Sequence, residues 1–213
     1  MSLLKINISN FDALIFDLGG VVLNLNYDLT ISRFKELGGD NFDKLYTQAS
    51  QDLIFDKYET GEINSDDFVN YLLDFLPDTT SQADVIQAWN AMILDLPKYR
   101  VEFLKNVRSV LPIFLFSNTN DLHYKYFNSE IEKSYDQKNL LNGIFDKCYY
   151  SHLVGFRKPN AEAFELVLNE QNLEAEKVLF IDDSIQHIEG ARGVGIKTHH
   201  LVESDICEII TFS

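Results

Sequence analysis

Four separate points of the chain carry polar residues of the kinds that phosphoryl transfer requires. Asp17 ends the apolar run of residues 14–16 and is followed by Gly19 and Gly20. Such a pattern is typical of a strand that opens into a tight turn at its carboxyl end, where open α/β sheets bind ligands. Taken alone, it also fits a plain turn, which Asp and Gly favour. The other three points are Ser117, Lys158 and the pair Asp182-Asp183.

Two further apolar runs end in polar residues, as the first one does. Residues 113–116 lead into Ser117, and residues 178–181 lead into Asp182-Asp183. Lys158 precedes Pro159, a residue suited to the first turn of a helix. An oxygen nucleophile that attacks a negatively charged phosphoryl centre needs a fixed carboxylate together with compensating positive charge. The sequence therefore predicts that these points meet at one edge of a sheet.

The elements that would position these residues follow from the hydrophobic pattern. Residues 11–24 and 106–213 alternate short apolar runs with amphipathic stretches, which indicates strands and helices that build a mainly parallel sheet. Between them, apolar residues recur at intervals of three and four, as Phe68, Leu72 and Phe75 do, which predicts a helical insertion. Ser65, followed by two Asp residues, is a predicted helix start.

The motifs resemble those of the haloacid dehalogenase-like hydrolase superfamily in both type and order. They are Asp-Leu-Gly-Gly-Val at 17–21, Ser-Asn-Thr at 117–119, Gly-x-x-Lys-Pro at 155–159 and Ile-Asp-Asp-Ser at 181–184. The resemblance covers essentially the whole chain and extends to the subgroup with a helical cap after the first motif, which is similar to sugar-phosphate phosphatases. It implies a Rossmann-like α/β core from residues 1–24 and 105–213, with a helical cap domain at 25–104.

The resemblance also implies a role for each site residue. Asp17 would be the nucleophile that forms an aspartyl-phosphate, with Ser117 and Lys158 as the other catalytic residues. The phosphate would be bound by Gly19, Gly20, Ser117, Asn118 and Lys158. Mg²⁺ prefers oxygen ligands in octahedral geometry, and adjacent carboxylates repel each other unless a cation compensates them. The expected metal ligands are Asp17, the backbone carbonyl of Gly19, Asp182 and, directly or through water, Asp183.

One position departs from the usual phosphatase pattern of this superfamily. That pattern is Asp-x-Asp, and its second Asp protonates the leaving oxygen, whereas this chain has Gly19 there. A positioned acid contributes about 10²- to 10⁴-fold, so we favour a phosphomonoester whose alcohol leaves without much help, such as a sugar 1-phosphate. A substitute acid could come from His123, His152 or the cap. Possible substrate contacts from the cap are Tyr27, Tyr58, Glu59 and Trp89.

Three alternative functions are also compatible with the absence of the second Asp. A haloacid dehalogenase needs no proton for its halide and no Mg²⁺, so the pair Asp182-Asp183 counts against it. A phosphonate hydrolase would use a cap lysine, for which Lys35, Lys44 and Lys57 are present without a distinguishing context. A non-catalytic, phosphate-binding regulatory protein has no evident need for the Asp17 carboxylate.

Composition sets limits on partners. The chain has 213 residues, 46% of them hydrophobic, which suits one domain with a modest insertion. Its formal net charge of −15 argues against nucleic acid as a partner. The first ten residues lack a basic and apolar targeting pattern, and no run approaches the roughly 20 apolar residues of a membrane helix. We expect a cytoplasmic monomer or homodimer, with a small phosphorylated metabolite as its partner and no membrane contact.

Overall fold

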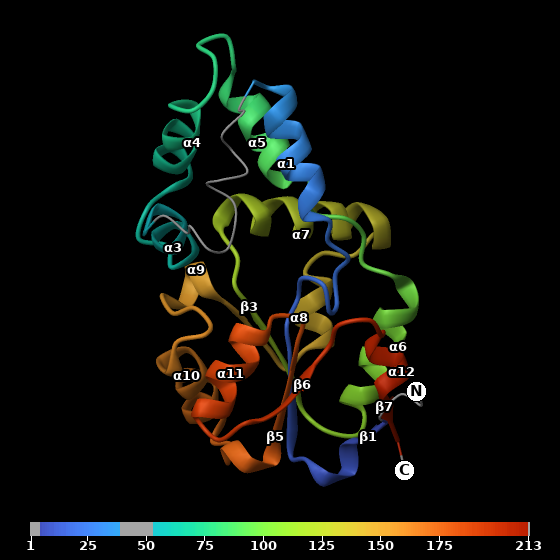
Figure 1. The fold of residues 1–213 in the computed structure, drawn as a ribbon. Helices are drawn as coiled ribbons and strands as arrows, with labels where there is room; N and C mark the ends of the chain where they lie inside the picture. Colours follow the sequence, from blue (N-terminus) through green and yellow to red (C-terminus); the bar gives the residue numbers. More distant parts are fainter. Residues whose placement is uncertain (1–4, 39–52, 213) are drawn as a thin grey trace.

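A five-stranded parallel sheet forms the centre of the molecule (Figure 1). The computed structural model describes residues 5–38 and 53–212. In the order β4-β3-β2-β5-β6, every neighbouring pair of strands is parallel. The strands are β2 (Ala13–Phe16), β3 (Ile113–Ser117), β4 (Lys147–Tyr150), β5 (Val178–Asp182) and β6 (Lys197–His200). The predicted α/β class with a mainly parallel sheet is confirmed.

Helices cover both faces of this sheet, because side chains alternate between the faces along each strand. In β2, Leu14 and Phe16 pack into one hydrophobic cluster and Ala13 and Ile15 into the other. The first cluster includes side chains of α6 (Lys98–Arg108), α7 (Asp121–Tyr135), α8 (Leu140–Ile144) and α12 (Ile206–Ile209). The second includes α10 (Ala161–Gln171) and α11 (Ile185–Gly193). All residues of β2, β3 and β5 are buried, which explains their continuous apolar runs.

The remaining elements are short. A second, two-stranded parallel sheet pairs β1 (Ile6–Asn7) with β7 (Ile210–Thr211), so both ends of the described chain meet beside the core. One 3-10 turn, η1 (Ile8–Asn10), follows β1, and another, η3 (Ala175–Lys177), precedes β5. Helix α9 (Ser151–Val154) follows β4 directly. No helix in the described ranges is long and apolar enough to cross a membrane.

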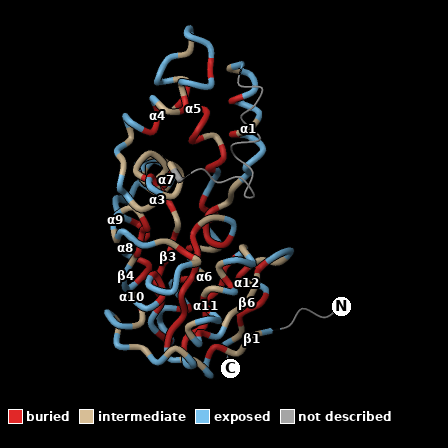
Figure 2. Tube along the Cα trace, turned by 60° about the vertical axis from the view of Figure 1, so that its left-hand side comes forward, coloured by how far each residue is buried: buried red, intermediate tan, exposed pale blue. Residues whose placement is uncertain are grey.

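Within the described residues, four helices with their own hydrophobic cluster rise above the carboxyl edge of the sheet (Figures 1 and 2). Packed aromatic rings form its centre: Tyr58 stacks on Phe68 with 4.1 Å between ring centroids, and Phe68 meets Trp89 edge-on at 4.8 Å. This separate cluster supports the predicted helical cap. The helices are α1 (Tyr27–Glu36), α3 (Leu53–Glu59), α4 (Ser65–Leu73) and α5 (Gln82–Asn90). Lys44 lies outside the described residues.

Helix α6 bears on where the cap ends. The boundary expected between residues 104 and 105 falls inside this helix, and Val101, Leu104 and Val107 pack in a cluster with the sheet. These contacts favour an end of the cap before α6. The division into two domains otherwise stays a prediction.

The start of α4 differs in detail from the prediction. The helix begins at Ser65, but Asn64 is the capping residue, since its side chain accepts a hydrogen bond from the Asp67 amide at 2.9 Å. The Ser65 hydroxyl donates instead to Asp121 at the start of α7, at 2.7 Å. Asn and Ser cap helices about equally well, so the sequence did not distinguish the neighbours. The Ser65 hydroxyl thus joins α4 to α7.

Candidate active site

The parallel sheet brings the predicted residues together. Asp17 directly follows β2, Ser117 ends β3 and Asp182 ends β5, and β2 lies between the other two strands. Since parallel strands share one carboxyl edge, the three residues meet there. Carboxylate oxygens of Asp17, Asp182 and Asp183 lie within 4.8 Å of one another. Segments far apart in the sequence therefore form one cluster of acidic groups.

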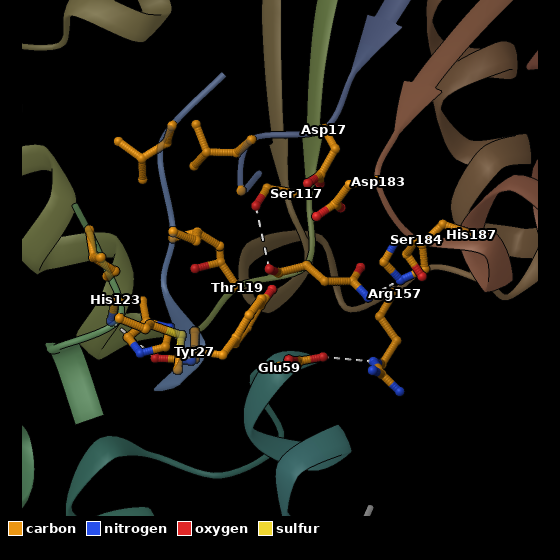
Figure 3. A pocket seen from close by; sticks show the side chains of 18 of the residues that line it. Asp17, Tyr27, Glu59, Ser117, Thr119, His123, Arg157, Asp183, Ser184 and His187 are labelled. Atoms are coloured by element: carbon orange, nitrogen blue, oxygen red, sulfur yellow. Dashed lines mark hydrogen bonds and ion pairs between the residues drawn. The ribbon is translucent and has the colours of Figure 1, made fainter. Parts of the chain in front are cut away.

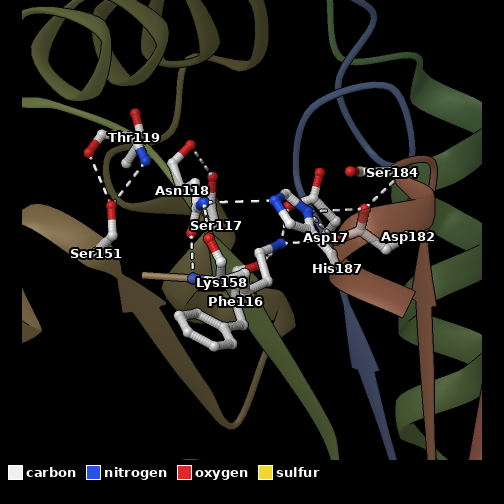
Figure 4. Close-up of polar contacts among 10 residues, drawn as sticks. All are labelled: Asp17, Phe116, Ser117, Asn118, Thr119, Ser151, Lys158, Asp182, Ser184 and His187. Carbon is white, nitrogen blue, oxygen red and sulfur yellow. Dashed lines mark hydrogen bonds and ion pairs between the residues drawn. The ribbon is translucent and has the colours of Figure 1, made fainter. Parts of the chain in front are cut away.

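Lys158 lies beneath this cluster and is fully buried (Figure 4). Its Nζ donates to Asp17 Oδ1 at 2.5 Å, to Asp182 Oδ2 at 2.7 Å and to the Phe116 carbonyl at 2.8 Å. An ammonium group has three donors and a high cost of burial unless all are satisfied. These three acceptors satisfy it completely. Lys158 thus fixes the carboxylates of two neighbouring strands.

The side chain of Asn118 holds the backbone on which Lys158 stands. Its Oδ1 accepts from the Lys158 amide at 2.9 Å, and its Nδ2 donates to the Lys158 carbonyl at 2.8 Å. Asn118 also lines the pocket described below. The side chain expected to bind substrate therefore positions the lysine, while its role toward a substrate stays a prediction.

Asp182 has partners on both oxygens. Besides Lys158, its Oδ1 accepts from the Ser184 amide at 2.8 Å, and His187 Nδ1 lies 3.0 Å from Oδ2. Burial favours the protonated acid, but the Lys158 and His187 interactions outweigh it and hold the pKa of Asp182 well below its ordinary value. Asp182 is therefore a carboxylate at neutral pH. His187 was not predicted, although its place five residues after Asp182, early in α11, brings it back over the strand end.

The charges of the other two carboxylates, Asp17 and Asp183, are only partly compensated by Lys158. Burial, opposed by Lys158 and reinforced by Asp182 and Asp183, raises the pKa of Asp17 to about 7. Burial and then the Asp182 charge raise the pKa of Asp183 to about 6. Three carboxylates, of which Asp17 and Asp182 are buried and Asp183 is exposed, share one ammonium, so the ionised cluster carries excess negative charge. That charge and the all-oxygen donor set fit Mg²⁺, which Asp17, Asp182 and Asp183 would hold.

Two glycines, Gly19 and Gly20, occupy positions at which a side chain would collide with its neighbours. Gly20 has a φ of +74°, and a Cβ there would stand 2.2 Å from Asp183 Oδ2. A Cβ on Gly19 would stand 2.4 Å from the Leu25 side chain. The volume in which the usual second Asp would begin is thus filled by Leu25.

A cavity of about 490 Å³ opens above the carboxylates (Figure 3). Asp17, Asp183 and Ser117 lie on its core side, and Tyr27 and Glu59 lie opposite them. Polar residues such as Thr119 and Asn120 also line the cavity, and its hydrophobic lining residues include Leu23, Leu25, Ile31, Phe55, Trp89, Met92 and Phe127. The pocket therefore combines a charged floor with partly apolar walls.

Only some of the residues predicted to bind the substrate line this pocket. Gly19, Ser117 and Asn118 line it, whereas Gly20 and Lys158 do not. Gly20 is where Asp183 leaves no room for a side chain, and Lys158 is covered by the groups it binds. Direct contact of these two residues with a substrate stays a prediction.

Neither histidine proposed as a substitute acid is placed as one. His123 lines the pocket, but its Nε2 lies 3.0 Å from the Trp89 carbonyl, and its Nδ1 lies 3.1 Å from Asn120 Nδ2. Burial lowers the pKa of His123 to about 4, so it is neutral and its one N–H is used by Trp89. His152 does not line the pocket.

Arg157 connects the helical insertion to the site. Its Nη1 binds Asp56 at 2.6 Å and its Nε binds Glu59 at 2.9 Å, both on α3. Its side chain is 13% exposed, so these are half-shielded ion pairs. Arg157 directly precedes Lys158 and was not among the predicted site residues, because an arginine in a loop is usually a solvated surface charge. The position of α3 is thereby tied to the residue that holds Asp17.

A parallel sheet flanked by helices, with carboxylates and a buried lysine at its carboxyl edge, is the arrangement of a group-transfer enzyme. The family model of haloacid dehalogenase-like hydrolases matches residues 11–195. The chain belongs to this family and is an enzyme of the hydrolase class.

Several characterised proteins are similar over nearly the full length. D-ribitol-5-phosphate phosphatase of Bacteroides thetaiotaomicron is 27% identical over 185 residues, which are 87% of this chain and 89% of that protein. A sesquiterpene phosphatase of Aspergillus oryzae is 28% identical, with 92% of each chain covered. A crystal structure of a haloacid dehalogenase family enzyme from B. thetaiotaomicron, in complex with magnesium and inorganic phosphate, has a TM-score of 0.81 at 28% identity and covers 92% of this chain and 97% of its own.

Magnesium is expected to stabilise the protein in a pH-dependent way. Because the folded-state pKa values of Asp17 and Asp183 are about 7 and 6, above the ordinary value of about 4, their protonated forms stabilise the metal-free fold. That contribution is fully present below pH ~4 and is lost as pH rises through 6 to 7. Mg²⁺ should therefore raise Tm by several degrees at pH 8 and by much less at pH 5, as measured by thermal unfolding with and without the metal.

The variant Asp17→Asn serves as the control for this measurement. It should lose most of the Mg²⁺-dependent shift at pH 8, while Asp78→Asn, at an exposed position between α4 and α5, should keep it. An equal Mg²⁺ shift at both pH values in the unmodified protein would contradict the assignment of these carboxyls as ligands.

The ion pairs of Arg157 should hold α3 in place. In Arg157→Gln both pairs to Asp56 and Glu59 are lost, so amide hydrogen exchange in α3 should become about tenfold faster, through easier local opening. Mass spectrometry of the peptide that covers α3 measures this. Arg108→Gln, which removes a comparable ion pair with Asp146, should leave α3 unchanged, and equal exchange in all three proteins would refute the role of Arg157.

Proposed function

We propose that this enzyme is a Mg²⁺-dependent phosphatase of small phosphomonoesters, with Asp17 as its nucleophile. The observation that carries the proposal is the Asp17 carboxylate, bound by Lys158 at 2.5 Å and placed at the floor of the pocket beside Asp182 and Asp183. The names of the two curated relatives, one acting on a polyol phosphate and one on a sesquiterpene phosphate, support phosphate esters as the substrate class.

The residues of the site suit a two-step displacement. Lys158 orients the Asp17 carboxylate for attack on phosphorus, which would give an aspartyl-phosphate and release the alcohol. Water would then attack the same phosphorus and restore the carboxylate. The Ser117 hydroxyl and nearby backbone amides would donate hydrogen bonds to the phosphoryl oxygens. Mg²⁺, when bound, supplies the positive charge that the three carboxylates and the phosphoryl group together lack.

The substrate class can be narrowed in two directions. A sugar 1-phosphate, with its more acidic anomeric hydroxyl, fits the absence of an acid at Gly19. A polyol 5-phosphate, as in the name of the Bacteroides relative, has an ordinary alkoxide as its leaving group and would need a proton donor from elsewhere. We propose sugar and polyol phosphates together as the first class to test.

A phosphate ester of an apolar alcohol is the second candidate. The walls of the pocket contain aliphatic and aromatic side chains, of which Ile31, Met92 and Phe127 are examples, and apolar surface favours an apolar leaving group. The name of the Aspergillus relative agrees with this candidate.

The three-carboxylate cluster weighs against the dehalogenase and phosphonate alternatives. Halide displacement has no use for a divalent cation at Asp182 and Asp183. Of the cap lysines considered for a phosphonate hydrolase, Lys35 and Lys57 do not line the pocket.

Phosphate release should separate these candidates. The panel contains a pentitol 5-phosphate, hexose 1- and 6-phosphates, farnesyl monophosphate and p-nitrophenyl phosphate, each with Mg²⁺ or EDTA. Turnover should require Mg²⁺ and should fall at least about 10³-fold in Asp17→Asn, because that amide is a poor nucleophile for phosphorus. Asp78→Asn, on the exposed surface, should behave as the unmodified enzyme. Phosphate release that persists in EDTA or in Asp17→Asn would refute the proposal.

A further inference from the structure

A single charged side chain interrupts the mainly apolar wall that the cap gives to the pocket. Among the described residues, Glu59 is the only charged side chain that the cap helices place on it. Figure 3 shows Glu59 across the pocket from Asp17 and Ser117. A phosphate ester with its phosphorus beside Asp17 would therefore extend its alcohol toward Glu59. The apolar lining residues of the cap and its connections include Leu25, Ile31, Phe55, Met92 and Ile93.

The tie between α3 and the loop before Lys158 does not by itself require Glu59 in the pocket. Arg157 binds two carboxylates of this helix, Asp56 at 2.6 Å and Glu59 at 2.9 Å. Glu59 and Arg157 line the pocket, whereas Asp56 does not. Asp56 thus makes the same kind of tie outside the pocket, and Glu59 adds a polar group inside it.

One carboxyl oxygen of Glu59 remains for a ligand. Its Oε2 accepts from Arg157 Nε, and within residues 5–38 and 53–212 no hydrogen bond involves its Oε1. The side chain is 28% exposed, so water can reach it while the pocket is empty. An apolar alcohol would remove that water and offer no hydrogen bond in return, which is unfavourable for a polar group. A hydroxyl group would replace the lost hydrogen bond.

Recognition of a hydroxyl group does not depend on the charge of Glu59. Burial raises the pKa of Glu59, and the positive charge of Arg157 opposes this shift. The carboxylate accepts a hydrogen bond from a hydroxyl group, and the carboxylic acid can accept one and also donate one. Since a hydroxyl group is both donor and acceptor, it fits either form.

We propose that Glu59 binds hydroxyl groups of the substrate's alcohol, so that the enzyme selects sugar and polyol phosphates over phosphate esters of apolar alcohols. This inference rests on the proposed phosphatase function, to which it adds the residue that sets substrate preference. Glu59 acts on the alcohol, at the end of the pocket away from phosphorus, and takes no part in the bonds that form and break at Asp17.

The test compares esters that differ only in their hydroxyl groups. A pentitol 5-phosphate is paired with n-pentyl phosphate, and a hexitol 6-phosphate with n-hexyl phosphate, all with Mg²⁺. Both members of a pair release a primary alcohol of the same chain length. We expect the unmodified enzyme to favour the polyol ester of at least one pair by about tenfold or more in kcat/KM, which is the typical effect of a hydrogen bond to a charged group.

Variants of Glu59 should remove this preference. In Glu59→Leu and Glu59→Ala the ratio of kcat/KM between polyol and alkyl ester should fall at least about tenfold. Glu59→Gln, whose amide still accepts and donates hydrogen bonds, should keep the ratio within about threefold. Asp56→Leu is the matched control, because it removes the other ion pair of Arg157 and lies outside the pocket wall. It should leave the ratio unchanged.

The remaining outcomes separate this inference from the proposed function. A ratio near one in the unmodified enzyme, or one that Glu59→Leu and Glu59→Ala leave unchanged, overturns the role of Glu59. An equal fall of the ratio in Asp56→Leu also overturns it, since the effect then belongs to the tie of α3. Mg²⁺-dependent turnover of p-nitrophenyl phosphate without preference for either polyol ester overturns only the role of Glu59. Absence of phosphate release from every ester, p-nitrophenyl phosphate included, refutes the phosphatase function itself.

Discussion

The buried ammonium of Lys158 is the interaction on which the site depends. It is inaccessible to solvent, yet it satisfies its three donors with oxygens of Asp17, Asp182 and Phe116. Removing one partner of such a buried pair typically costs about 3–5 kcal/mol, because the other charge is left uncompensated. The lysine thus fixes the proposed nucleophile, Asp17, and one expected metal ligand, Asp182.

The surroundings of Lys158 connect it to the rest of the molecule. Asn118 binds both its amide and its carbonyl, so the loop after β3 sets the position of the lysine. The preceding residue, Arg157, binds Asp56 and Glu59 on α3. Helix α3 contributes to the pocket wall through Glu59. The position of α3 and that of the proposed nucleophile are therefore linked through Arg157 and Lys158, two consecutive residues of one loop.

Much of this arrangement could be predicted from the sequence, because a strand that is buried on both faces is a continuous apolar run and its polar end is conspicuous. Asp17, Ser117 and Asp182 were found in this way, as was the parallel sheet. His187 was missed because its contact with Asp182 depends on how α11 begins.

Two kinds of feature could not be derived from the sequence: the direction in which a side chain points, and the part of the molecule against which a helix packs. The pattern did not tell whether Lys158 faces solvent, substrate or the interior, and the structure places it in the interior, outside the pocket wall. It likewise did not show that Leu25 fills the space beside Gly19, or that α6 packs with the sheet. These features depend on contacts between segments distant in sequence, for which hydrophobic periodicity carries no information.

The most direct test of the account is mass spectrometry of the enzyme after rapid acid quenching during turnover with Mg²⁺. The account predicts a phosphoryl group on the peptide that contains Asp17, and its absence from Asp17→Asn treated in the same way. A phosphoryl group on another residue would contradict the account. So would an unmodified Asp17 peptide at every quench time while the enzyme turns over its substrate at the full rate.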